Sequence, residues 1–328
     1  MGEKREQARI VLAADIGGSR ARLLLARADK DGWHELHRRE TPSAAHADIE
    51  TLIDGFLDET GETPAAACIA VAGPLEHGCV RMTNLPWTAN GERLKAHWGF
   101  SRLWLINDFA AQAYGLDCLG SDDLFPLCAG EPESGGVRAL IGAGTGLGMA
   151  VLAGAPLKPV VLASQGGLAD FAPRNARELA LCEAMLAWHG RASLEMLLSG
   201  HGIERIYRFV SGMSPEAPLS RDAAAITAAA LAGEAAAAEA LRFFARLLAA
   251  AASNLALTVM ASGGVYLSGG IAPRILPFLR EPAVTEAFRV HPSMSAVLAH
   301  IPLHVVCDES LGLKGAARIA SVLARDET

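Results

Sequence analysis

The sequence predicts an α/β fold of two domains, and three observations lead to this prediction. Apolar strand-like runs and helix-forming runs are mixed along the whole chain, as in α/β proteins. A length of 328 residues is enough for about two domains, each with its own core. A strand, a glycine turn and a second strand occur once in each half, at 9–28 and 137–154, so we predict an internal duplication.

Composition limits the classes of partner. The chain is 51% hydrophobic and 20% charged, which is typical of a globular protein. A formal net charge of -7 argues against a nucleic-acid partner and against an anionic membrane surface. The 6 cysteines are scattered without a CxxC or Cys/His cluster, so we expect free thiols in a reduced, cytoplasmic setting and no zinc site.

Two segments could be mistaken for targeting or membrane elements. The charged N-terminus leads into an apolar run that is short before Asp15 and lacks a small-residue cleavage pattern, so we do not interpret it as a signal peptide. The apolar region 223–265 contains Glu234, Glu239, Arg242 and Arg246. It has no uninterrupted apolar span of 18 residues or more, and we predict a long core helix with no membrane segment.

The first half is expected to alternate strands with a turn and a helix. We predict strands at 9–15, 19–28 and 68–75, a further extended segment at 79–87, and a short strand at 102–106 followed by a helix at 109–116. The last strand ends at Asn107-Asp108, so it delivers two polar groups at its carboxyl end. Open α/β sheets place their ligands at that end.

The second half repeats the hairpin and then becomes mainly helical. After the hairpin at 137–154, we predict helices in 176–190, 192–200, 202–210 and 222–261, strands at 264–268 and 301–308, and a closing helix at 311–324. This order again mixes strands with helices, in agreement with the α/β class.

Two glycine turns have the composition of phosphate-binding elements. In DIGGS, Asp15 to Ser19, backbone N–H groups can approach phosphate oxygens and the carboxylate can hold a metal-bound water. GAGTGLG, Gly142 to Gly148, lacks both the GxGxxG spacing and the lysine of a P-loop, which nearly excludes an NAD oxidoreductase. Each of the two is equally compatible with an ordinary hairpin.

Two further motifs follow apolar runs. In IND, Asp108 at a strand end can accept a proton from an attacking hydroxyl, while the alternative is that Asn107 or Asp108 only caps the next helix. In LSGGIAP, the glycine pair Gly269-Gly270 at a helix start can admit a nucleotide against exposed amides, and tight strand–helix packing explains it equally well.

The order of the motifs is more specific than any one of them. DIGGSRAR, AVAGPL with MTNLPW, LINDFAAQA, GAGTGLGMA, QGGLADFAP, LEMLLSGHGIERIYR, LSGGIAPRIL and DESLGLKGAA extend over nearly the whole chain. The set resembles the actin-like ATPase superfamily and, within it, the bacterial glucokinase family of hexose kinases. The resemblance implies a duplicated ribonuclease-H-like design with an interdomain cleft: a small domain of 1–112 plus 309–328 and a large domain of 113–308.

The resemblance also implies roles for individual residues. Asp108 matches the general base that takes the proton from the sugar 6-hydroxyl, and Asn107 and Glu195 match sugar ligands. The expected cofactors are ATP and Mg²⁺, with Asp15 holding the metal through water. The residues that match the nucleotide site are Ala14, Asp15, Ile16, Gly17, Gly18, Ser19, Gly144, Thr145, Gly146, Gly269 and Gly270. A homodimer is also implied.

The sugar pocket is where the chain departs from the family pattern. The family usually has Glu-Gly-Gly-His where this chain has Gln165-Gly166-Gly167-Leu168, and Ser19-Arg20 replaces Thr-Asn. Gln165 keeps hydrogen-bonding groups without the charge, and Leu168 has none. Losing one neutral and one charged hydrogen bond costs about 0.5–1.5 and about 1.5–3 kcal/mol, so sugar binding is expected to weaken roughly tenfold to a thousandfold.

Three functions remain open at this point. The first is an ATP-dependent hexose kinase that converts glucose to glucose 6-phosphate. The second is a catalytically weak homologue that binds nucleotide or sugar and acts as a regulator, which the altered Gln165 and Leu168 motivate. The third is a kinase for a different sugar. The retained Asp108 favours a kinase, because a pure sensor has little use for a general base.

Overall fold

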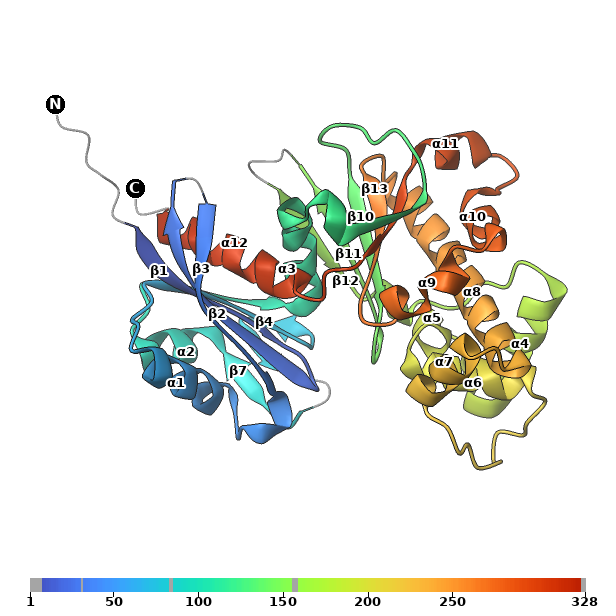
Figure 1. The fold of residues 1–328 in the computed structure, drawn as a ribbon, viewed down its shortest axis with the longest axis horizontal. Helices are drawn as coiled ribbons and strands as arrows, with labels where there is room; N and C mark the ends of the chain where they lie inside the picture. Colours follow the sequence, from blue (N-terminus) through green and yellow to red (C-terminus); the bar gives the residue numbers. More distant parts are fainter. Residues whose placement is uncertain (1–7, 31, 83–84, 155–158, 326–328) are drawn as a thin grey trace. The chain divides into compact units, whose positions relative to one another are not determined.

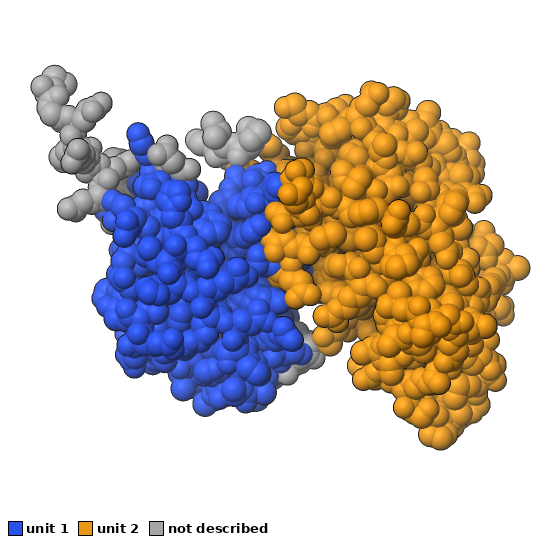
Figure 2. Space-filling model, in the orientation of Figure 1, with its two compact units in different colours: residues 1–120, 310–328 blue, residues 121–309 orange. Residues whose placement is uncertain are grey.

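The chain divides into two compact units. The computed structural model describes residues 8–30, 32–82, 85–154 and 159–325, so Thr83 and Asn84 of the MTNLPW motif lie outside the described residues. Unit 1 contains residues 1–120 and 310–328, and unit 2 contains residues 121–309 (Figure 2). Residues 113–120, which the sequence assigned to the large domain, therefore belong to unit 1, and Glu309 belongs to unit 2.

Unit 1 is built on a five-stranded mixed sheet (Figure 1). Its strand order is β3-β2-β1-β4-β8, with β1 and β2 antiparallel and β1, β4 and β8 parallel. A small sheet of order β5-β6-β7 completes the unit. The strands are β1 (Arg9–Ile16), β2 (Arg20–Asp29), β3 (Gly32–Pro42), β4 (Ala66–Val71), β5 (Leu75–Glu76), β6 (Cys79–Arg81), β7 (Thr88–Asn90) and β8 (Arg102–Asn107).

Helices cover both faces of the main sheet of unit 1. Alternate residues of β1 point to opposite faces, so Leu12 packs toward α1 and α2 while Val11 packs toward α12. The helices are α1 (Ile49–Thr60), α2 (Gly91–Trp98), α3 (Asp108–Gly115) and α12 (Leu311–Arg325). Residues 113–120 join this unit because the end of α3 packs closely on α12: a Cβ at Gly115 would lie 2.3 Å from the carbonyl oxygen of Leu311.

Unit 2 repeats the strand order of unit 1. Its sheet has the order β12-β11-β10-β13-β14-β9, in which an antiparallel hairpin is again followed by two parallel strands. The strands are β9 (Leu124–Cys128), β10 (Arg138–Ala143), β11 (Leu147–Ala153), β12 (Val160–Ser164), β13 (Gly264–Ser268) and β14 (Leu303–Val306). The predicted α/β class and the duplicated design are confirmed.

The helical segment of unit 2 surrounds a long buried helix. The helices are α4 (Ala176–His189), α5 (Leu194–Leu197), α6 (Gly200–Val210), α7 (Ala223–Leu231), α8 (Ala235–Val259), α9 (Leu276–Leu279), α10 (Pro282–Arg289) and α11 (Ser295–His300). The prediction of one long helix in 222–261 was wrong in one respect. The chain breaks between α7 and α8, where Gly233 adopts a positive φ of 92° and α8 starts anew after Glu234.

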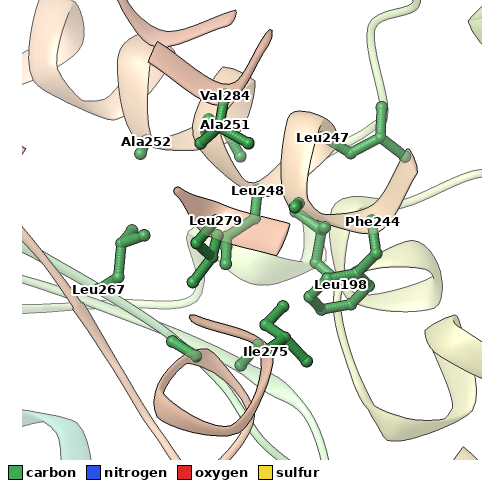
Figure 3. Packing of buried hydrophobic residues seen from close by; sticks show 14 of the residues in the cluster. Leu198, Phe244, Leu247, Leu248, Ala251, Ala252, Leu267, Ile275, Leu279 and Val284 are labelled. Carbon is green, nitrogen blue, oxygen red and sulfur yellow. The ribbon is translucent and has the colours of Figure 1, made fainter. Parts of the chain in front are cut away.

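Helix α8 forms the centre of the unit 2 core. Phe244, Leu248 and Ala252 project from α8 among Leu198, Ile275 and Leu279 (Figure 3). By length and composition α8 is one helix that could cross a membrane, but 72% of its most apolar window is buried inside the fold. Its apolar character is therefore explained by burial in the core of unit 2.

Candidate active site

Two carboxylates lie at one edge of the unit 1 sheet. Asp15, near the end of β1, pairs with Ala70 of β4, and Ala70 pairs with Ile106 of β8. Asp108 follows directly after β8 as the first residue of α3. Because β1, β4 and β8 are parallel, their carboxyl ends meet at this edge. The structure thus brings together the two acids that the sequence singled out separately.

The carboxylate of Asp15 is largely buried. Its side chain is 17% exposed, and Nη1 of Arg22 lies 4.0 Å from its Oδ2. Burial raises the pKa of Asp15 to about 6, and the positive charge of Arg22 opposes this shift. Gly312, in the first turn of α12, is packed against the same carboxylate: a Cβ there would lie 2.7 Å from Oδ2. A residue with a side chain at this position would displace Asp15.

The carboxylate of Asp108 accepts two hydrogen bonds and has a pKa near neutrality. Its Oδ1 accepts hydrogen bonds from the N–H of Phe109 and from Nδ2 of Asn107, both at 2.9 Å. Burial and the nearby charge of Asp15 together raise the pKa of Asp108 to about 7, against the opposing effect of these hydrogen bonds. A carboxylate with a pKa near neutrality is well matched to accepting a proton in catalysis.

The side chain of Asn107 is fully engaged within unit 1. Its Oδ1 accepts from the N–H groups of Phe109 and Ala110 at 3.0 and 3.3 Å, so it caps α3. Its Nδ2 donates to the carbonyl of Gly73 at 3.1 Å and to Asp108. The capping alternative is therefore correct for Asn107, and its amide also fixes the orientation of Asp108.

The first glycine turn is supported by a buried serine that the sequence did not single out. The N–H of Gly17 donates to the carbonyl of Arg20 at 2.9 Å, which closes the turn. Ser43 is fully buried; its hydroxyl donates to the carbonyl of Gly17 at 2.7 Å, and its N–H donates to the carbonyl of Ser19 at 3.1 Å. No sequence pattern pointed to Ser43, because it lies 26 residues from Gly17 along the chain.

The remaining residues near this turn divide into core and surface. Ala14 and Ile16 are fully buried and paired on both sides, with β2 and β4, so they support the turn from within the sheet. The side chain of Arg20 is 65% exposed and donates to Glu40 at 2.7 Å. This hydrogen bond, with Arg22 on the same carboxylate, holds the pKa of Glu40 below its usual value. Arg20 thus extends along the surface of the sheet toward β3.

The second glycine turn, Gly144–Gly146, joins β10 to β11 in unit 2. The N–H of Gly144 donates to the carbonyl of Gly146, and the carbonyl of Gly144 accepts from Gly200 at the start of α6, both at 2.8 Å. Gly269 lies beside this turn with a φ of 81°, and a Cβ there would lie 2.4 Å from the carbonyl oxygen of Ala143. The close-packing interpretation is therefore correct for Gly269.

A cavity of about 650 Å³ opens beside this turn within unit 2. Its size lies within the range of about 300–1,000 Å³ that is usual for small-molecule and cofactor sites. Gly144, Thr145 and Gly270 line it, whereas Gly146 and Gly269 only support it. The walls are mainly apolar, with a few polar side chains that the sequence did not indicate, namely His201, Glu204, Asp222, Thr227 and Arg274. Backbone groups at one end and apolar walls beyond suit a nucleotide.

The loop at Gln165–Leu168 is packed on the strand that follows this turn. Gly166–Leu168 form a single 3-10 turn, and a Cβ at Gly167 would lie only 1.9 Å from the carbonyl oxygen of Leu147. Gln165 is exposed and the side chain of Leu168 is 47% exposed, so both face away from the core. Gly167 is thus required for the loop to approach β11.

Glu195 also contacts Leu147, at the start of β11. It lies in α5, and its Oε2 accepts the N–H of Leu147 at 3.0 Å. The N–H of Leu194 donates to the carbonyl of Ala169 at 2.9 Å, which ties α5 to the loop. Leu147 therefore contacts both Glu195 and Gly167, so the glycine turn and the candidate sugar residues of unit 2 form one connected assembly.

Comparison with known proteins identifies the family. The glucokinase family model matches residues 12–323. A glucokinase of Nostoc punctiforme is 35% identical, with 96% of this chain and 99% of that protein covered. The chain belongs to the glucokinase family. A second glucokinase, of Chromohalobacter salexigens, is 37% identical over 94% of this chain and 96% of that protein. The crystal structure of a glucokinase from an Antarctic psychrotroph has a TM-score of 0.85 at 33% identity, covering 96% of this chain and 99% of that one.

The acids of this glucokinase-family chain also fit a divalent cation. Mg²⁺ prefers oxygen ligands and few protein carboxylates. Asp15 and Asp108 provide two largely buried carboxylates, and the charge of Asp15 is one cause of the raised pKa of Asp108. A cation at this edge would relieve that repulsion. The donor set of unit 1 is therefore suited to Mg²⁺ delivered with a nucleotide.

Proposed function

We propose that this protein is an ATP-dependent glucokinase that transfers the γ-phosphoryl group of ATP to the 6-hydroxyl of glucose. The observation that carries the proposal is Asp108. This carboxylate stands at the carboxyl end of β8, is oriented by Asn107, and has a pKa raised to about 7 by burial and by Asp15. Membership of the glucokinase family supports the choice of reaction and of substrate.

In the proposed mechanism the oxygen of the sugar 6-hydroxyl attacks the γ-phosphorus and its proton passes to Asp108, while the bond from the γ-phosphorus to the bridging oxygen breaks and ADP leaves. Phosphoryl transfer requires mainly positioning and charge stabilisation from the protein. Asn107 holds Asp108 and caps α3, so it acts first as a positioning residue. Bound Mg²⁺ would neutralise charge on the transferred group, and Asp15 is the proposed ligand, through water.

The nucleotide would be bound mainly by backbone groups. We assign the base and ribose to the 650 Å³ cavity of unit 2, with the phosphates at Gly144–Gly146 and Gly270. In unit 1, the backbone amides of Gly18 and Ser19 would likewise suit phosphate oxygens. Glycines suit this role because nothing lies within 4 Å of a Cβ built at Gly144 or Gly270, which leaves room for phosphate oxygens.

Within unit 2, the sugar would be held by Gln165, Leu168 and Glu195. Glu195 keeps a carboxylate there, with one oxygen already bound to Leu147. Gln165 and Leu168 are the two departures from the family pattern, and both side chains are exposed on the loop. We therefore propose that glucose is accepted with reduced affinity.

The protonation of Asp108 should control the rate. A base must be deprotonated, and the pKa of Asp108 is raised to about 7, mainly by burial. Because a bound cation would offset the charge of Asp15, kcat/KM for the sugar is expected to rise with pH up to about 7 and to be level above it. Initial rates from pH 5.5 to 9 at saturating ATP measure this. A profile that is flat between pH 6 and 8 would show that no group with this pKa limits the reaction.

Restoring the family residues in the loop should improve sugar binding. The double substitution Gln165→Glu with Leu168→His is expected to lower the KM for glucose by roughly tenfold or more, because it adds one charged and one neutral hydrogen bond. The matched control is Leu179→His, an equally exposed leucine on α4. An unchanged KM in the double variant would mean that these two positions do not touch the sugar.

A panel of sugars separates this proposal from its alternatives. ADP release is coupled to an indicator reaction with glucose, mannose, fructose, galactose, glucosamine and N-acetylglucosamine, with Asp108→Ala as the background. Turnover that is fastest with glucose supports the glucokinase proposal, and turnover with another sugar alone supports a different specificity. If no sugar exceeds the background while ATP still binds by calorimetry, the protein is a binding or regulatory homologue.

Two further properties belong to the proposal. ATP is supplied in the cytoplasm, and the described cysteines are all free, so we propose a cytoplasmic enzyme. We also propose a homodimer with no nucleic-acid or membrane partner. Sedimentation at micromolar concentration tests the assembly.

A further inference from the structure

A second cavity in unit 2 carries charged groups that the proposed mechanism does not use. It measures about 220 Å³ and lies where the end of α4, one face of α6 and the loop before α7 meet. His201, Arg205 and Arg208 are spaced four and three residues apart on α6, so they share one face of that helix. Trp188 and His189 contribute from α4, and Leu219 from the loop.

The two arginines of this cavity are bonded to neutral partners. Nη1 of Arg205 donates to the carbonyl of Met196 at 3.0 Å. Nη1 of Arg208 donates to the carbonyls of Ser214 and Ala217 at 2.7 and 2.6 Å. Within the described part of the chain, no carboxylate forms an ion pair with either guanidinium. Neither guanidinium is therefore held in an ion pair, although the charges of Glu204 and Glu195 act on Arg205 from a longer distance, and each guanidinium has further N–H donors to offer.

Three other arginines of unit 2, in contrast, form ion pairs with a carboxylate. Arg177, Arg221 and Arg242 each pair with a glutamate, at 2.5, 2.5 and 2.9 Å. At the cavity, burial lowers the pKa of Arg205 against the opposing charges of Glu204 and Glu195. Burial together with the charge of Arg205 lowers the pKa of His189.

Among the described residues that line this cavity, the carboxylate is that of Glu204, and its two oxygens contact groups other than the arginines. Oε1 of Glu204 accepts the N–H of Ala223 at the start of α7, at 3.1 Å. Its Oε2 lies 3.2 Å from Nδ1 of His201. Glu204 thus ties α6 to α7 and forms no direct ion pair with Arg205 or Arg208, although its charge raises the pKa of Arg205.

We propose that this cavity is a phosphate-binding site, distinct from the nucleotide cavity, which takes inorganic phosphate or a small phosphate monoester. Guanidinium groups match phosphate oxygens in charge and geometry, and the imidazole of His189 adds a donor. The cavity is smaller than the roughly 300–1,000 Å³ of sites for drug-sized ligands, which excludes a whole nucleotide.

The position of the site connects it to both parts of the unit 2 active site. Glu204 and His201 also line the 650 Å³ cavity. Nη1 of Arg205 donates to the carbonyl of Met196, the neighbour of Glu195 in α5, and the charge of Glu195 opposes the lowering of the pKa of Arg205. A phosphate bound here would therefore compete for the charge of Arg205 with the candidate sugar-contacting acid.

The test is a calorimetric titration with inorganic phosphate at constant ionic strength, in chloride buffer, with sodium glycerol 3-phosphate as the monoester probe. Each titration is repeated with saturating AMPPNP and glucose, because free phosphate can also enter the glycine turn. We expect one phosphate to bind in both conditions. Arg208→Gln is expected to weaken binding by about tenfold or more, since a charge-assisted contact is lost.

Two other variants keep the outcome unambiguous. Leu219→Trp fills the cavity without changing any charge and should also remove binding. Arg177→Gln removes one positive charge from α4 outside the cavity, and it should bind phosphate as the wild type does. Tighter binding of inorganic phosphate than of the monoester would identify the free ion as the ligand, and the reverse order a monoester.

Three results would overturn the proposal. They are the absence of phosphate binding, its complete loss on adding AMPPNP, and wild-type affinity in both Arg208→Gln and Leu219→Trp. Because the readout is binding of phosphate and not turnover, it does not depend on the sugar substrate. A protein that binds phosphate here but phosphorylates no sugar would contradict only the proposed function.

Discussion

Replacing Asp108 with asparagine is expected to lower kcat for glucose phosphorylation by about 10²–10⁴-fold, the range attributed to a lost general base. An asparagine at this position can still accept from Phe109 and Asn107 through its oxygen, so α3 should stay in place. The KM for ATP should change little, because the proposed nucleotide cavity is in unit 2. Steady-state kinetics with both substrates varied provide the measurement.

The same substitution should stabilise the fold at alkaline pH. The pKa of Asp108 is raised from 3.8 to about 7, so the folded state resists ionisation and stability is lost as pH rises from about 4 to about 7. Removing the carboxylate is expected to raise the free energy of unfolding at pH 8 by on the order of 2 kcal/mol, and to have no such effect at pH 4. Urea unfolding at both pH values measures this.

The matched control is Asp58→Asn, the same chemical change on the exposed surface of α1. It should alter neither kcat nor the difference in stability between pH 4 and pH 8. If Asp108→Asn retained more than about a tenth of the wild-type kcat, Asp108 would not be the general base. Lost activity without the gain in stability at pH 8 would mean that the pKa of Asp108 is not raised.

Placing alanine at Gly167 should have the second large effect. The new Cβ would lie 1.9 Å from the carbonyl oxygen of Leu147, so the loop or the start of β11 must move. Overpacking of this kind costs about 1–3 kcal/mol of stability. The N–H of Leu147 is bound by Glu195, so the displacement should also disturb the proposed sugar residues and lower kcat/KM for glucose by about 100-fold.

Gly55→Ala is the control for this prediction. Gly55 lies inside α1, and the nearest atom to a Cβ there is Nη1 of Arg39 at 3.9 Å. Alanine at that position should leave the activity unchanged and stabilise the protein by about 0.5–1 kcal/mol, because glycine is a poor helix former. Thermal unfolding and glucose kinetics, measured on both variants, test this prediction. Wild-type kinetics in Gly167→Ala would show that the loop does not control sugar binding.

The acids at the edge of the unit 1 sheet, Asp15 and Asp108, were predictable from the sequence because each follows a local pattern. Asp15 and Asn107-Asp108 each end an apolar run, and parallel strands bring their carboxyl ends together. The supporting residues were not predictable in this way. Ser43 and Gly312 act through contacts with residues distant along the chain, and neither belongs to a pattern of periodicity or turn chemistry.

The missed elements have a similar physical reason. β3 is an edge strand with mostly exposed and charged residues, so it has no apolar run to mark it. β12 is also an edge strand, and its residues are largely exposed. The break between α7 and α8 depends on one glycine with a positive φ inside an alanine-rich run, where composition alone favours an unbroken helix.

The role of the Gln165–Leu168 loop could be inferred only from the sequence and the structure together. The sequence showed that the loop departs from the family pattern in an amide and a leucine. The contacts show why the loop needs its glycines: Gly166 and Gly167 pack on Met149 and Leu147 of β11. The side chains of Gln165 and Leu168 beside them are exposed and make no such demand on the packing.

The most direct test of the central claim is the identity of the product. Purified protein is incubated with ATP, Mg²⁺ and glucose, and the product is examined by phosphorus and proton NMR, with 6-deoxyglucose as the matched substrate that lacks the 6-hydroxyl. We predict glucose 6-phosphate from glucose, with phosphorus coupled to the two protons on C6, and no sugar phosphate from 6-deoxyglucose. ADP release without a sugar phosphate, or phosphorylation at another hydroxyl, would contradict the proposed function.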